Sequence, residues 1–333
     1  MILGVSSCLL GNMCRYDGHG AKDDFVFNSL KDYFTLLPYC PENSIWSAPR
    51  DAIRQVSIDG EVKIFTSTKE PKDVTDILDD ACEKMALKAC NDDLCGFVLK
   101  SASPSCGMER VKVYQPLNAP SIKNGVGVFA KKLKEKMPNL PIEEEGRLND
   151  AWLRENFLMQ VYSYADLKEL LKKEKKISNL VEFHTSYKYL IYSKSQNSYK
   201  ILGKIVANSE KKDIEELYKD YEAEFLKAIA TKSTLNKTYN ILLHIFGYFK
   251  KHITKEEKVD ILESMYDFKN RVIPLISVIK IFNIYINRFD ITYLKNQKFL
   301  NPYPSKLALR SDLKSFKWKK LIYLLLEAEL VEV

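Results

Sequence analysis

The stretch Met1-Ile2-Leu3-Gly4-Val5-Ser6-Ser7-Cys8 opens the chain and decides how its first half folds. An apolar run of this length indicates a buried strand, and it ends in a turn of small residues that carries a cysteine. Two further apolar stretches lead into turns with a cysteine, at Cys40 and at Cys106. Open α/β sheets place their ligands at the carboxyl ends of such strands. We therefore expect Cys8, Cys40 and Cys106 to meet at one crevice.

Three cysteines at one crevice suit a soft metal, which means zinc, copper(I) or an iron–sulfur cluster. The paired spacing of structural zinc sites and the dense run of ferredoxins are both absent, so the expected ligand set leaves one metal position open. The alternative is that all three are inert core cysteines. Cys14 could reach the same site as a fourth ligand, whereas Cys82, Cys90 and Cys95 are expected in the apolar core.

The first half is predicted to be an α/β domain over residues 1–160, with a Rossmann-like and mostly parallel sheet. Strands and helices alternate along it, and a hairpin is expected around the turn Asp59-Gly60. Expected helices cover 28–36, 75–88 and 126–136, and an edge strand is expected at 111–114.

The second half changes in texture, because residues 151–333 contain only two glycines and show helical periodicity. We expect a helical linker over 161–177 and an all-α domain over 178–333. The expected helices cover 166–176, 209–231, 235–252, 255–268, 272–288 and 316–330.

Composition narrows the class of protein. The chain has 333 residues, of which 46% are hydrophobic and 29% charged, as in a globular protein of two domains. No apolar run is long enough to cross a membrane, and seven cysteines without paired spacing fit a reducing cytoplasm. No obligate protein partner is indicated. The net charge of +7 is uneven, at roughly −3 over 1–150 and roughly +10 over 151–333, which suggests a polyanionic partner for the second half.

Several motifs of the first half together resemble the thiouracil desulfidase family over roughly residues 1–160. They occur in the family's order, and they are Val5-Ser6-Ser7-Cys8-Leu9-Leu10-Gly11, Arg15-Tyr16-Asp17-Gly18, Cys40-Pro41-Glu42, Pro49-Arg50, Asp73-Val74-Thr75, Ser103-Pro104-Ser105-Cys106-Gly107, Gly125-Val126-Gly127-Val128 and Glu145-Gly146-Arg147-Leu148. The stretch 43–48 departs from the family, which has a glycine-containing segment there.

This resemblance implies a [4Fe–4S] cluster held by Cys8, Cys40 and Cys106, with a fourth iron open to the sulfur of a thiolated base. The iron would act as a Lewis acid while water attacks the ring carbon and the sulfur departs as hydrosulfide. Glu42, beside Cys40, is the expected catalytic residue, which would activate the water or protonate the ring. The expected substrate contacts are Ser101, Ser103, Arg15 and Asp17.

The second half resembles the YbgA-like helical family. The resemblance rests on Phe183-His184, Lys188-Tyr189-Leu190, Leu202-Gly203-Lys204, Val206-Ala207-Asn208, Gly247-Tyr248-Phe249-Lys250, Ile273-Pro274-Leu275 and Tyr293-Leu294 with Gln297. Fusion to a desulfidase-like half favours RNA binding here. We expect phosphate contacts from Lys188, Lys204, Lys250 and Arg271, beside the stacking platforms Tyr187, Tyr189, Tyr192, Tyr199 and Tyr248. The alternative is that these lysines and this arginine only solvate helix faces.

Three functions remain open at this point. The first is a desulfidase that converts a thiolated uridine in tRNA, 4-thiouridine by preference, to uridine. The second is a desulfidase of free 2-thiouracil or a thionucleotide, with the helical half serving in oligomerisation. The third is a non-enzymatic iron–sulfur sensor that binds nucleic acid.

Overall fold

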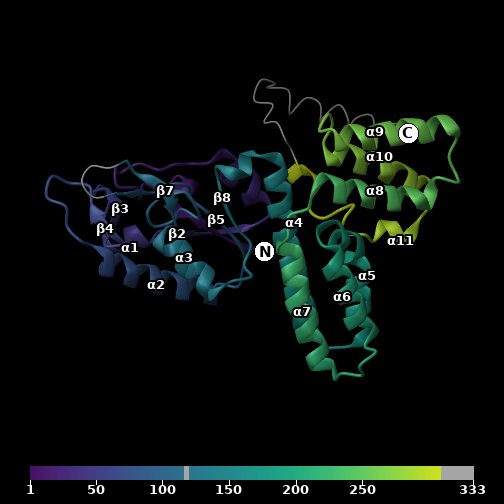
Figure 1. Cartoon of the computed structure of the whole chain (residues 1–333), viewed down its shortest axis with the longest axis horizontal. Coiled ribbons are helices and arrows are strands. Elements are labelled where there is room, and N and C mark those ends of the chain that lie inside the picture. The colour runs from purple at the N-terminus through teal and green to yellow at the C-terminus, as the bar shows by residue number, and fades with distance from the viewer. Residues whose placement is uncertain (116–119, 309–333) are drawn as a thin grey trace, which may run out of the picture.

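The computed structural model describes residues 1–115 and 120–308. Figure 1 shows the strands gathered in the N-terminal half of the chain and a purely helical half beside it. The predicted fold class, an α/β domain followed by an all-α domain, is therefore confirmed. The helix expected over 316–330 lies outside the described residues.

The first half is built on a sheet whose four strands all run parallel, in the order β2-β1-β5-β8. The strands are β1 (Ile2–Ser6), β2 (Thr35–Tyr39), β5 (Leu94–Leu99) and β8 (Ile142–Glu144). β5 is buried along its whole length, as expected of a central strand covered on both faces. The chain leaves β1 toward β2 but leaves β5 toward β8, so the strand order reverses between β1 and β5.

A second, mixed sheet has the order β4-β3-β6-β7. Its strands are β3 (Ile53–Ile58), β4 (Glu61–Thr66), β6 (Val111–Tyr114) and β7 (Ile122–Gly125). β3 and β4 form the hairpin expected around Asp59-Gly60. The edge position expected for 111–114 is wrong, because β6 lies between β3 and β7. β7 is mostly exposed and lacks apolar alternation, so its sequence did not indicate a strand.

Two helices cover one face of the parallel sheet. They are α2 (Thr75–Asn91) and α3 (Val128–Lys136), which confirm the helices expected in those regions. Leu78 of α2, Phe97 of β5 and Phe129 of α3 share one buried core. The short α1 (Pro41–Ile45) follows β2 directly.

The helix expected over 28–36 is wrong. The structure has a π turn, η2 (Phe25–Ser29), and a 3₁₀ turn, η3 (Leu30–Asp32), before β2 begins at Thr35. Val26 and Leu30 are fully buried in the core on the second face of the sheet. Pairing of β2 with β1 therefore takes residues that local sequence assigned to a helix.

A single long helix, α4 (Ala151–Lys172), joins the two halves. Phe157 and Val161 pack in the same core as β1, whereas Leu167 and Leu170 pack in the core of the helical half. Residue 160, the expected end of the first domain, lies inside this helix. Most of the expected linker over 161–177 is therefore its continuation, and the helix expected from 166 begins at Ala151 instead.

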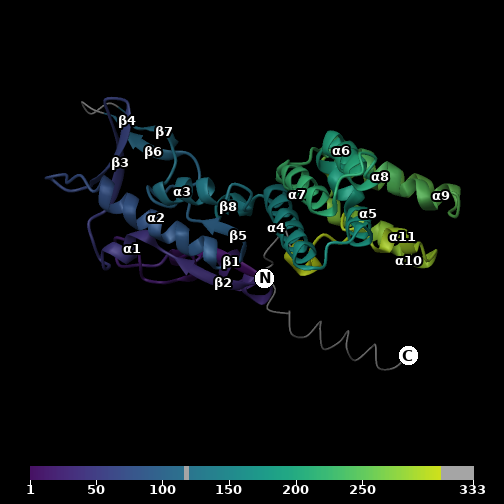
Figure 2. The same cartoon turned by 90° about the horizontal axis from the view of Figure 1, so that it is seen from below.

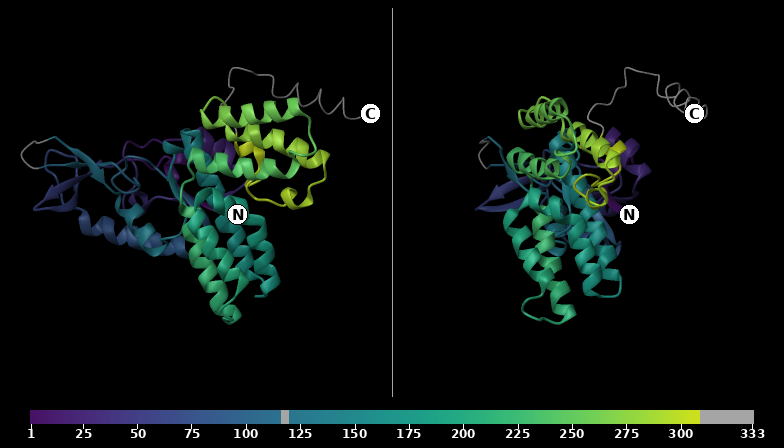
Figure 3. Two further views of the ribbon diagram at one scale, coloured as in Figure 1. Left: turned by 45° about the vertical axis from the view of Figure 1, so that its right-hand side comes forward. Right: turned by 90° about the vertical axis from the view of Figure 1, so that its right-hand side faces the viewer.

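The helical half is a set of helices around one large core. They are α5 (Ile177–Lys194), α6 (Gln196–Ala207), α7 (Ile214–Ala230), α8 (Leu235–Phe249), α9 (Lys255–Lys269), α10 (Leu275–Arg288) and α11 (Thr292–Lys295). Figure 2 shows α4 between the two halves, and Figure 3 shows α5 to α7 standing together below α8 to α10. The helices expected at 209–231, 235–252, 255–268 and 272–288 are confirmed with shifted ends, whereas α6 was not expected. None of the described helices is both long and apolar enough to span a membrane.

Candidate functional site

The three cysteines selected from the sequence follow neighbouring parallel strands. Cys8 lies in a 3₁₀ turn, η1 (Ser7–Leu10), after β1, and Cys40 comes directly after β2 as the N-cap residue of α1. Cys106 lies in the turn that follows β5. All three line one cavity of about 380 Å³. The cavity thus opens at the carboxyl ends of β2, β1 and β5, beside the reversal of strand order where such sheets bind ligands.

The turn that carries Cys106 is held against the start of α3. Phe129 N donates to Ser105 O at 2.8 Å, and Gly127 N donates to Gly107 O at 2.7 Å. A Cβ on Gly127 would lie 2.5 Å from the oxygen of Ser105, so only glycine permits this approach. The position of Cys106 therefore depends on residues about twenty positions further along the chain.

A fourth cysteine, Cys14, lies in the same cavity and is only 6% exposed. Its sulfur is within hydrogen-bonding reach of the thiols of Cys40 and Cys8, which lower the pKa of Cys14 far below its ordinary value. The same contacts, followed by burial, raise the pKa values of Cys8 and Cys40. Burial, with the Glu42 carboxylate as the second cause, raises the pKa of Cys106 to about 11.

Two cationic side chains that the sequence analysis did not select line this cavity, Arg50 and Lys100. Arg50 is 7% exposed, and its Nη2 lies 2.7 Å from Oε2 of Glu42. Its Nε and Nη1 are buried and have no hydrogen-bond partner within 1–115 and 120–308. Lys100 forms an ion pair with Glu145. Arg50 stands in a quoted motif and Lys100 directly follows β5, and these positions were the available signals.

Glu42 occupies the position that its expected role requires. It lines the cavity beside Cys40, and its carboxylate accepts from Ser105 Oγ at 2.5 Å and from Arg50 Nη2 at 2.7 Å. One oxygen thus has a neutral donor and the other a cationic donor. The carboxylate is fixed in orientation while it faces the four thiols.

The two serines expected to contact substrate both line the cavity, but both have partners of their own. Ser101 Oγ donates to Glu145 Oε1 at 2.7 Å. Ser103 Oγ accepts from Cys106 N at 3.1 Å and lies 3.0 Å from Ser105 Oγ. Ser103 therefore fixes the cysteine turn, whereas Ser101 lies beside the Lys100–Glu145 pair.

Arg15 and Asp17 differ in their placement. Arg15 lines the cavity, whereas the lining does not include Asp17. Their side chains pair with each other at 3.5 Å, and Asp17 Oδ1 also accepts from His19 N at 3.1 Å. Asp17 thus shapes the loop that carries Arg15.

The donor set fits an anionic sulfur-rich group better than a single ion. No group of three His, Cys, Asp or Glu side chains in the described part of the chain is arranged for one metal ion. Four thiols instead surround a cavity with two cations at its wall. The unpartnered N–H groups of Arg50 are donors that thiolate and sulfide sulfur would satisfy, and leaving such buried donors unpaired costs about 1–3 kcal/mol each. An iron–sulfur cluster matches this chemistry.

The remaining cysteines lie away from the cavity. Cys82 and Cys95 are buried in the two cores of the first half, as expected. Cys90 is exposed near the end of α2, so its expected core position is wrong. One helix can bury Cys82 and expose Cys90, because eight residues correspond to more than two turns and rotate the side chain away from the buried face.

The four basic residues expected to bind RNA do not form one patch. Lys188 is half-buried on α5, Lys204 is exposed on α6, and Lys250 is exposed directly after α8. Arg271 lies between α9 and α10, where it lines a cavity together with the first residues of α8. The 15 residues of α8 therefore separate Arg271 from Lys250 by about 20 Å.

Lys188 stands between two tyrosine stacks. Tyr192 stacks on Tyr199 with ring centroids 4.9 Å apart, and Tyr248 stacks on Tyr293 at 5.6 Å. Burial lowers the pKa of Lys188, but the hydroxyls of Tyr293, Tyr199 and Tyr248 outweigh burial, so the net shift is upward. Lys188 is therefore a cation at neutral pH. We name these five residues the tyrosine–lysine face.

Two tyrosines grouped with this face from the sequence are core residues instead. Tyr187 is 1% exposed, stacks on Phe183 and donates to Asp166 Oδ2 at 2.6 Å. Tyr189 is 5% exposed and donates to Tyr248 at 3.0 Å. Neither is available as a stacking platform.

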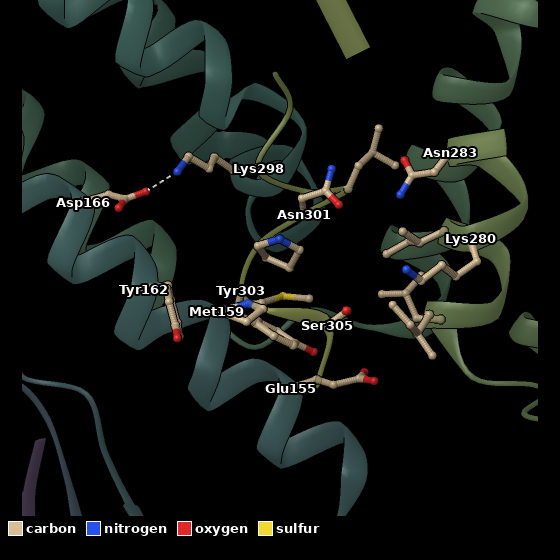
Figure 4. Close-up of a pocket in the computed structure, with 16 residues that line it drawn as sticks. Glu155, Met159, Tyr162, Asp166, Lys280, Asn283, Lys298, Asn301, Tyr303 and Ser305 are labelled. Carbon is tan, nitrogen blue, oxygen red and sulfur yellow. Dashed lines mark hydrogen bonds and ion pairs between the residues drawn. The ribbon is translucent and has the colours of Figure 1, made fainter. Parts of the chain in front are cut away.

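A second cavity, of about 420 Å³, lies where α4 meets α10 and residues 298–305 (Figure 4). At one wall Lys298 pairs with Asp166 at 2.6 Å, and at another Lys280 and Asn283 of α10 face the space. Its lining contains no cysteine. The paired residues Asp166 and Lys298 are 132 positions apart, so local sequence gave no sign of this cavity.

Comparison with known proteins identifies both halves. Residues 3–145 match the family described as 2-thiouracil desulfurase, and residues 188–304 match a protein family of unknown function, DUF1722. YbbK of Bacillus subtilis (strain 168), an uncharacterized protein, is 32% identical over 157 residues, which cover 45% of this chain and 99% of YbbK. YbgA of Escherichia coli (strain K12), also uncharacterized, is 21% identical over 154 residues, which cover 46% of this chain and 91% of YbgA.

One solved structure is also similar. It is TudS, named a [4Fe-4S]-dependent thiouracil desulfidase, and it is 26% identical in sequence. The match covers 44% of this chain and 92% of TudS, with a TM-score of 0.35. The cluster and the substrate in that name are those of TudS.

Proposed function

Because this chain belongs to the 2-thiouracil desulfurase family and continues into a DUF1722 domain, we propose that it removes sulfur from a thiolated uridine in tRNA. The preferred substrate is 4-thiouridine. The observation that carries the proposal is the meeting of Cys8, Cys40 and Cys106 with Glu42 at one cavity. We take the α/β half to carry the chemistry and the helical half to hold the RNA.

The cofactor of the proposal is a [4Fe–4S] cluster on Cys8, Cys40 and Cys106. When bound, such a cluster with one iron free of these thiolates would supply a Lewis acid for the thiocarbonyl sulfur. The chain supports it in two ways. Its three thiols lie at the ends of adjacent strands, and Arg50 and Lys100 place positive charge beside an anionic group.

Glu42 is proposed to move the proton. Replacing sulfur by oxygen at a ring carbon needs a water made nucleophilic and a proton delivered to the leaving side, and a carboxylate can do both in turn. Ser105 and Arg50 hold both oxygens of Glu42, so the carboxylate has few orientations to lose. Arg50 also favours the ionised carboxylate, which is the form that accepts a proton from water.

The size of the cavity limits what part of a substrate can enter. About 380 Å³ accommodates a nucleobase with its sugar, but not a folded RNA. The base must therefore leave its stack, as in other enzymes that act on a base within a nucleic acid. Tyr16, which is 44% exposed at the edge of the cavity, offers a ring for that base to stack on.

The helical half supports an RNA substrate over a free base. Its sequence is roughly +10 in charge, and the tyrosine–lysine face joins a buried-edge cation to aromatic rings. The same helices contain Gly203 and Gly247, where an added Cβ would meet nothing within 4 Å. Glycine within a helix costs up to ~1 kcal/mol relative to alanine, and no internal contact of the protein requires it at these two positions. Close approach of an external ligand is a reason for both.

A free thiolated base is the second candidate substrate. YbbK is matched over 99% of its length by 45% of this chain, so a protein of that size needs no second half. The cavity would hold a free thiouracil as well as a flipped base.

The full-length protein, reconstituted anaerobically with iron and sulfide, should be assayed for hydrosulfide release from 4-thiouridine-containing tRNA and from free 2-thiouracil side by side. We expect release from both, with a kcat/KM at least about 10-fold higher for tRNA, a preference of about 1.4 kcal/mol. Cys106→Ala should abolish release, whereas Cys90→Ser, an exposed thiol away from the cavity, should not. Release from free base alone would favour the second candidate, and release from neither would refute the desulfidase.

A further inference from the structure

Cys14 reaches the cavity from a different kind of element than the other three cysteines. Those follow the strands β1, β2 and β5, whereas Cys14 lies on the loop 11–24. The base of this loop is fixed, because Ala21 N donates to Cys8 O at 2.9 Å and Asp23 N donates to Leu9 O at 3.0 Å. The loop therefore folds back over the Cys8 turn and carries Cys14 near its tip.

The sulfur of Cys14 lies among the other thiols. It is within hydrogen-bonding reach of both Cys8 and Cys40, and Cys40 Sγ also lies 3.9 Å from the carbonyl oxygen of Cys14. Cys14 is 6% exposed, which is less than Cys8 at 9%. Four thiols thus converge where the proposed cluster needs three.

Arg50 joins the Cys14 loop to the opposite wall of the cavity. Its backbone N donates to Tyr16 O at 2.8 Å, two residues after Cys14. Its guanidinium is close enough to favour a thiolate at Cys14, and two of its buried nitrogens have no partner in the described chain. A negatively charged sulfur at Cys14 is therefore compensated.

From these contacts we propose that Cys14 is a displaceable fourth ligand of the cluster. In the resting protein its thiolate caps the iron that Cys8, Cys40 and Cys106 leave open, and it withdraws when the sulfur of the substrate enters. The inference rests on the proposed function. The exchange breaks one iron–thiolate bond and forms one bond from iron to the substrate sulfur. No electrons are transferred, and the freed thiolate takes up one proton.

The loop explains why this ligand can leave while the other three stay. Cys8, Cys40 and Cys106 directly continue strands or closely bonded turns, so moving them would break sheet or turn hydrogen bonds. Cys14 has only turn contacts, such as its own N to Asn12 O at 2.9 Å. Arg15 and Tyr16 also line the cavity, so a shift of this loop widens it for the base. A permanent fourth thiolate would leave no position for the substrate.

Cys14→Ala and Cys14→Ser test the proposal in the full-length, anaerobically reconstituted protein. Cys90→Ser is the matched control, because it removes an exposed thiol outside the cavity. The first readout is iron and sulfide content, which should equal that of the wild type in all three variants. The second is the EPR signal of the reduced cluster during titration with cyanide, a small ligand for an open iron.

Both Cys14 variants should reach half-saturation at about 10-fold lower cyanide than the wild type, which is the effect expected if Cys14 occupies the iron in about nine of ten molecules. Cys90→Ser should titrate like the wild type. Equal titration curves for the wild type and both Cys14 variants would overturn the proposal. Iron loss in these variants as severe as in Cys106→Ala would overturn it too, because Cys14 would then be a permanent ligand. A wild type that takes up no iron would refute the proposed function itself.

Discussion

Ser105 Oγ lies 2.5 Å from Oε1 of Glu42, although the two residues are 63 positions apart. The other oxygen of the same carboxylate lies 2.7 Å from Arg50 Nη2. Glu42 begins the helix after β2, whereas Ser105 belongs to the turn after β5, so the pair ties together two of the three cysteine-bearing segments. The proposed proton carrier is thus held by the same framework that positions the thiols.

Glu42→Gln should lose turnover but keep the cluster. The amide has the shape of the carboxylate but cannot accept a proton from water, so we expect kcat to fall by about 100-fold or more. The cluster absorbance should be unchanged, since the cysteines remain. The measurement is hydrosulfide release together with the visible spectrum. Glu144→Gln is the control, because Glu144 is 3% exposed and accepts from Met108 N, but it does not line the cavity. Normal turnover in Glu42→Gln would remove Glu42 from the mechanism.

Replacing Lys188, Lys204 and Lys250 together with Glu should weaken tRNA binding. Fewer neutralised phosphates also mean that affinity falls less steeply with salt, by about 0.9 per phosphate contact on a log–log plot for a duplex. Binding measured at several salt concentrations gives both quantities. Turnover of free 2-thiouracil should remain, since the cavity lies in the other half.

Arg271→Glu is the matched charge control for this prediction. It lies about 20 Å from Lys250, at the other end of α8, so we expect a much smaller effect on tRNA binding. If Arg271→Glu weakens binding as much as the triple variant does, the RNA surface is wider than the tyrosine–lysine face. If the triple variant binds normally, the basic excess is only a solvated surface.

Gly203→Ala should separate stability from binding. An added Cβ meets no atom within 4 Å, and alanine favours a helix by up to ~1 kcal/mol, so the free energy of unfolding should rise. If RNA approaches α6 at this point, the same methyl group should raise the Kd for tRNA. Urea unfolding and tRNA binding measure the two effects. Ser264→Ala, on the exposed surface of α9, should leave tRNA binding unchanged. A more stable protein with unchanged binding would show that the RNA does not approach there.

Lys194 should make stability rise with pH. It is 1% exposed, it lies 3.2 Å from Thr231 O, and no carboxylate among the described residues forms an ion pair with it. Burial, followed by the charge of Lys232, lowers the pKa of Lys194 from 10.5 to about 8. Between these two pH values the unfolded chain holds a proton that the folded chain has lost. The free energy of unfolding therefore increases from pH 8 toward 10.5, by at most ~3 kcal/mol.

Lys194→Met should remove this part of the pH dependence. Urea unfolding at pH 7.5, 8.5 and 9.5 measures it as the difference between the variant and the wild type. Lys237→Met, at an exposed lysine that donates to Lys194 O at 3.1 Å, should keep the wild-type slope. Equal slopes for the wild type and Lys194→Met would mean that Lys194 stays charged in the folded protein.

The arrangement of the site follows from the sequence only up to the strand ends. The apolar runs before Cys8 and Cys106 predict buried strands, and parallel strands bring their carboxyl ends to one edge. Strand ends alone therefore predict that the three cysteines and Glu42 lie together. They do not predict a role for Arg50, because an arginine after a proline has no local pattern that distinguishes a buried cation from a surface one.

Local sequence also determined most helices, because apolar residues at helical spacing describe one buried face whatever it packs against. It was wrong wherever a distant partner decided the outcome. Residues 28–36 became two turns and the start of β2 because β1 offered a pairing edge. β6 became an inner strand because β7 pairs with it, and Cys90 became exposed because α2 turns that side to solvent.

The sequence by itself thus determined the two halves, the cysteine-bearing strand ends and the excess of positive charge in the helical half. Only the tertiary structure decided that Cys14 joins the other thiols, that Ser105 and Arg50 hold Glu42, and that Arg271 lies apart from Lys188. The physical reason is that strand and helix patterns are set by neighbours in sequence. Contacts between loops and between helix faces depend instead on how those elements pack, and residues far apart in the chain fix them together.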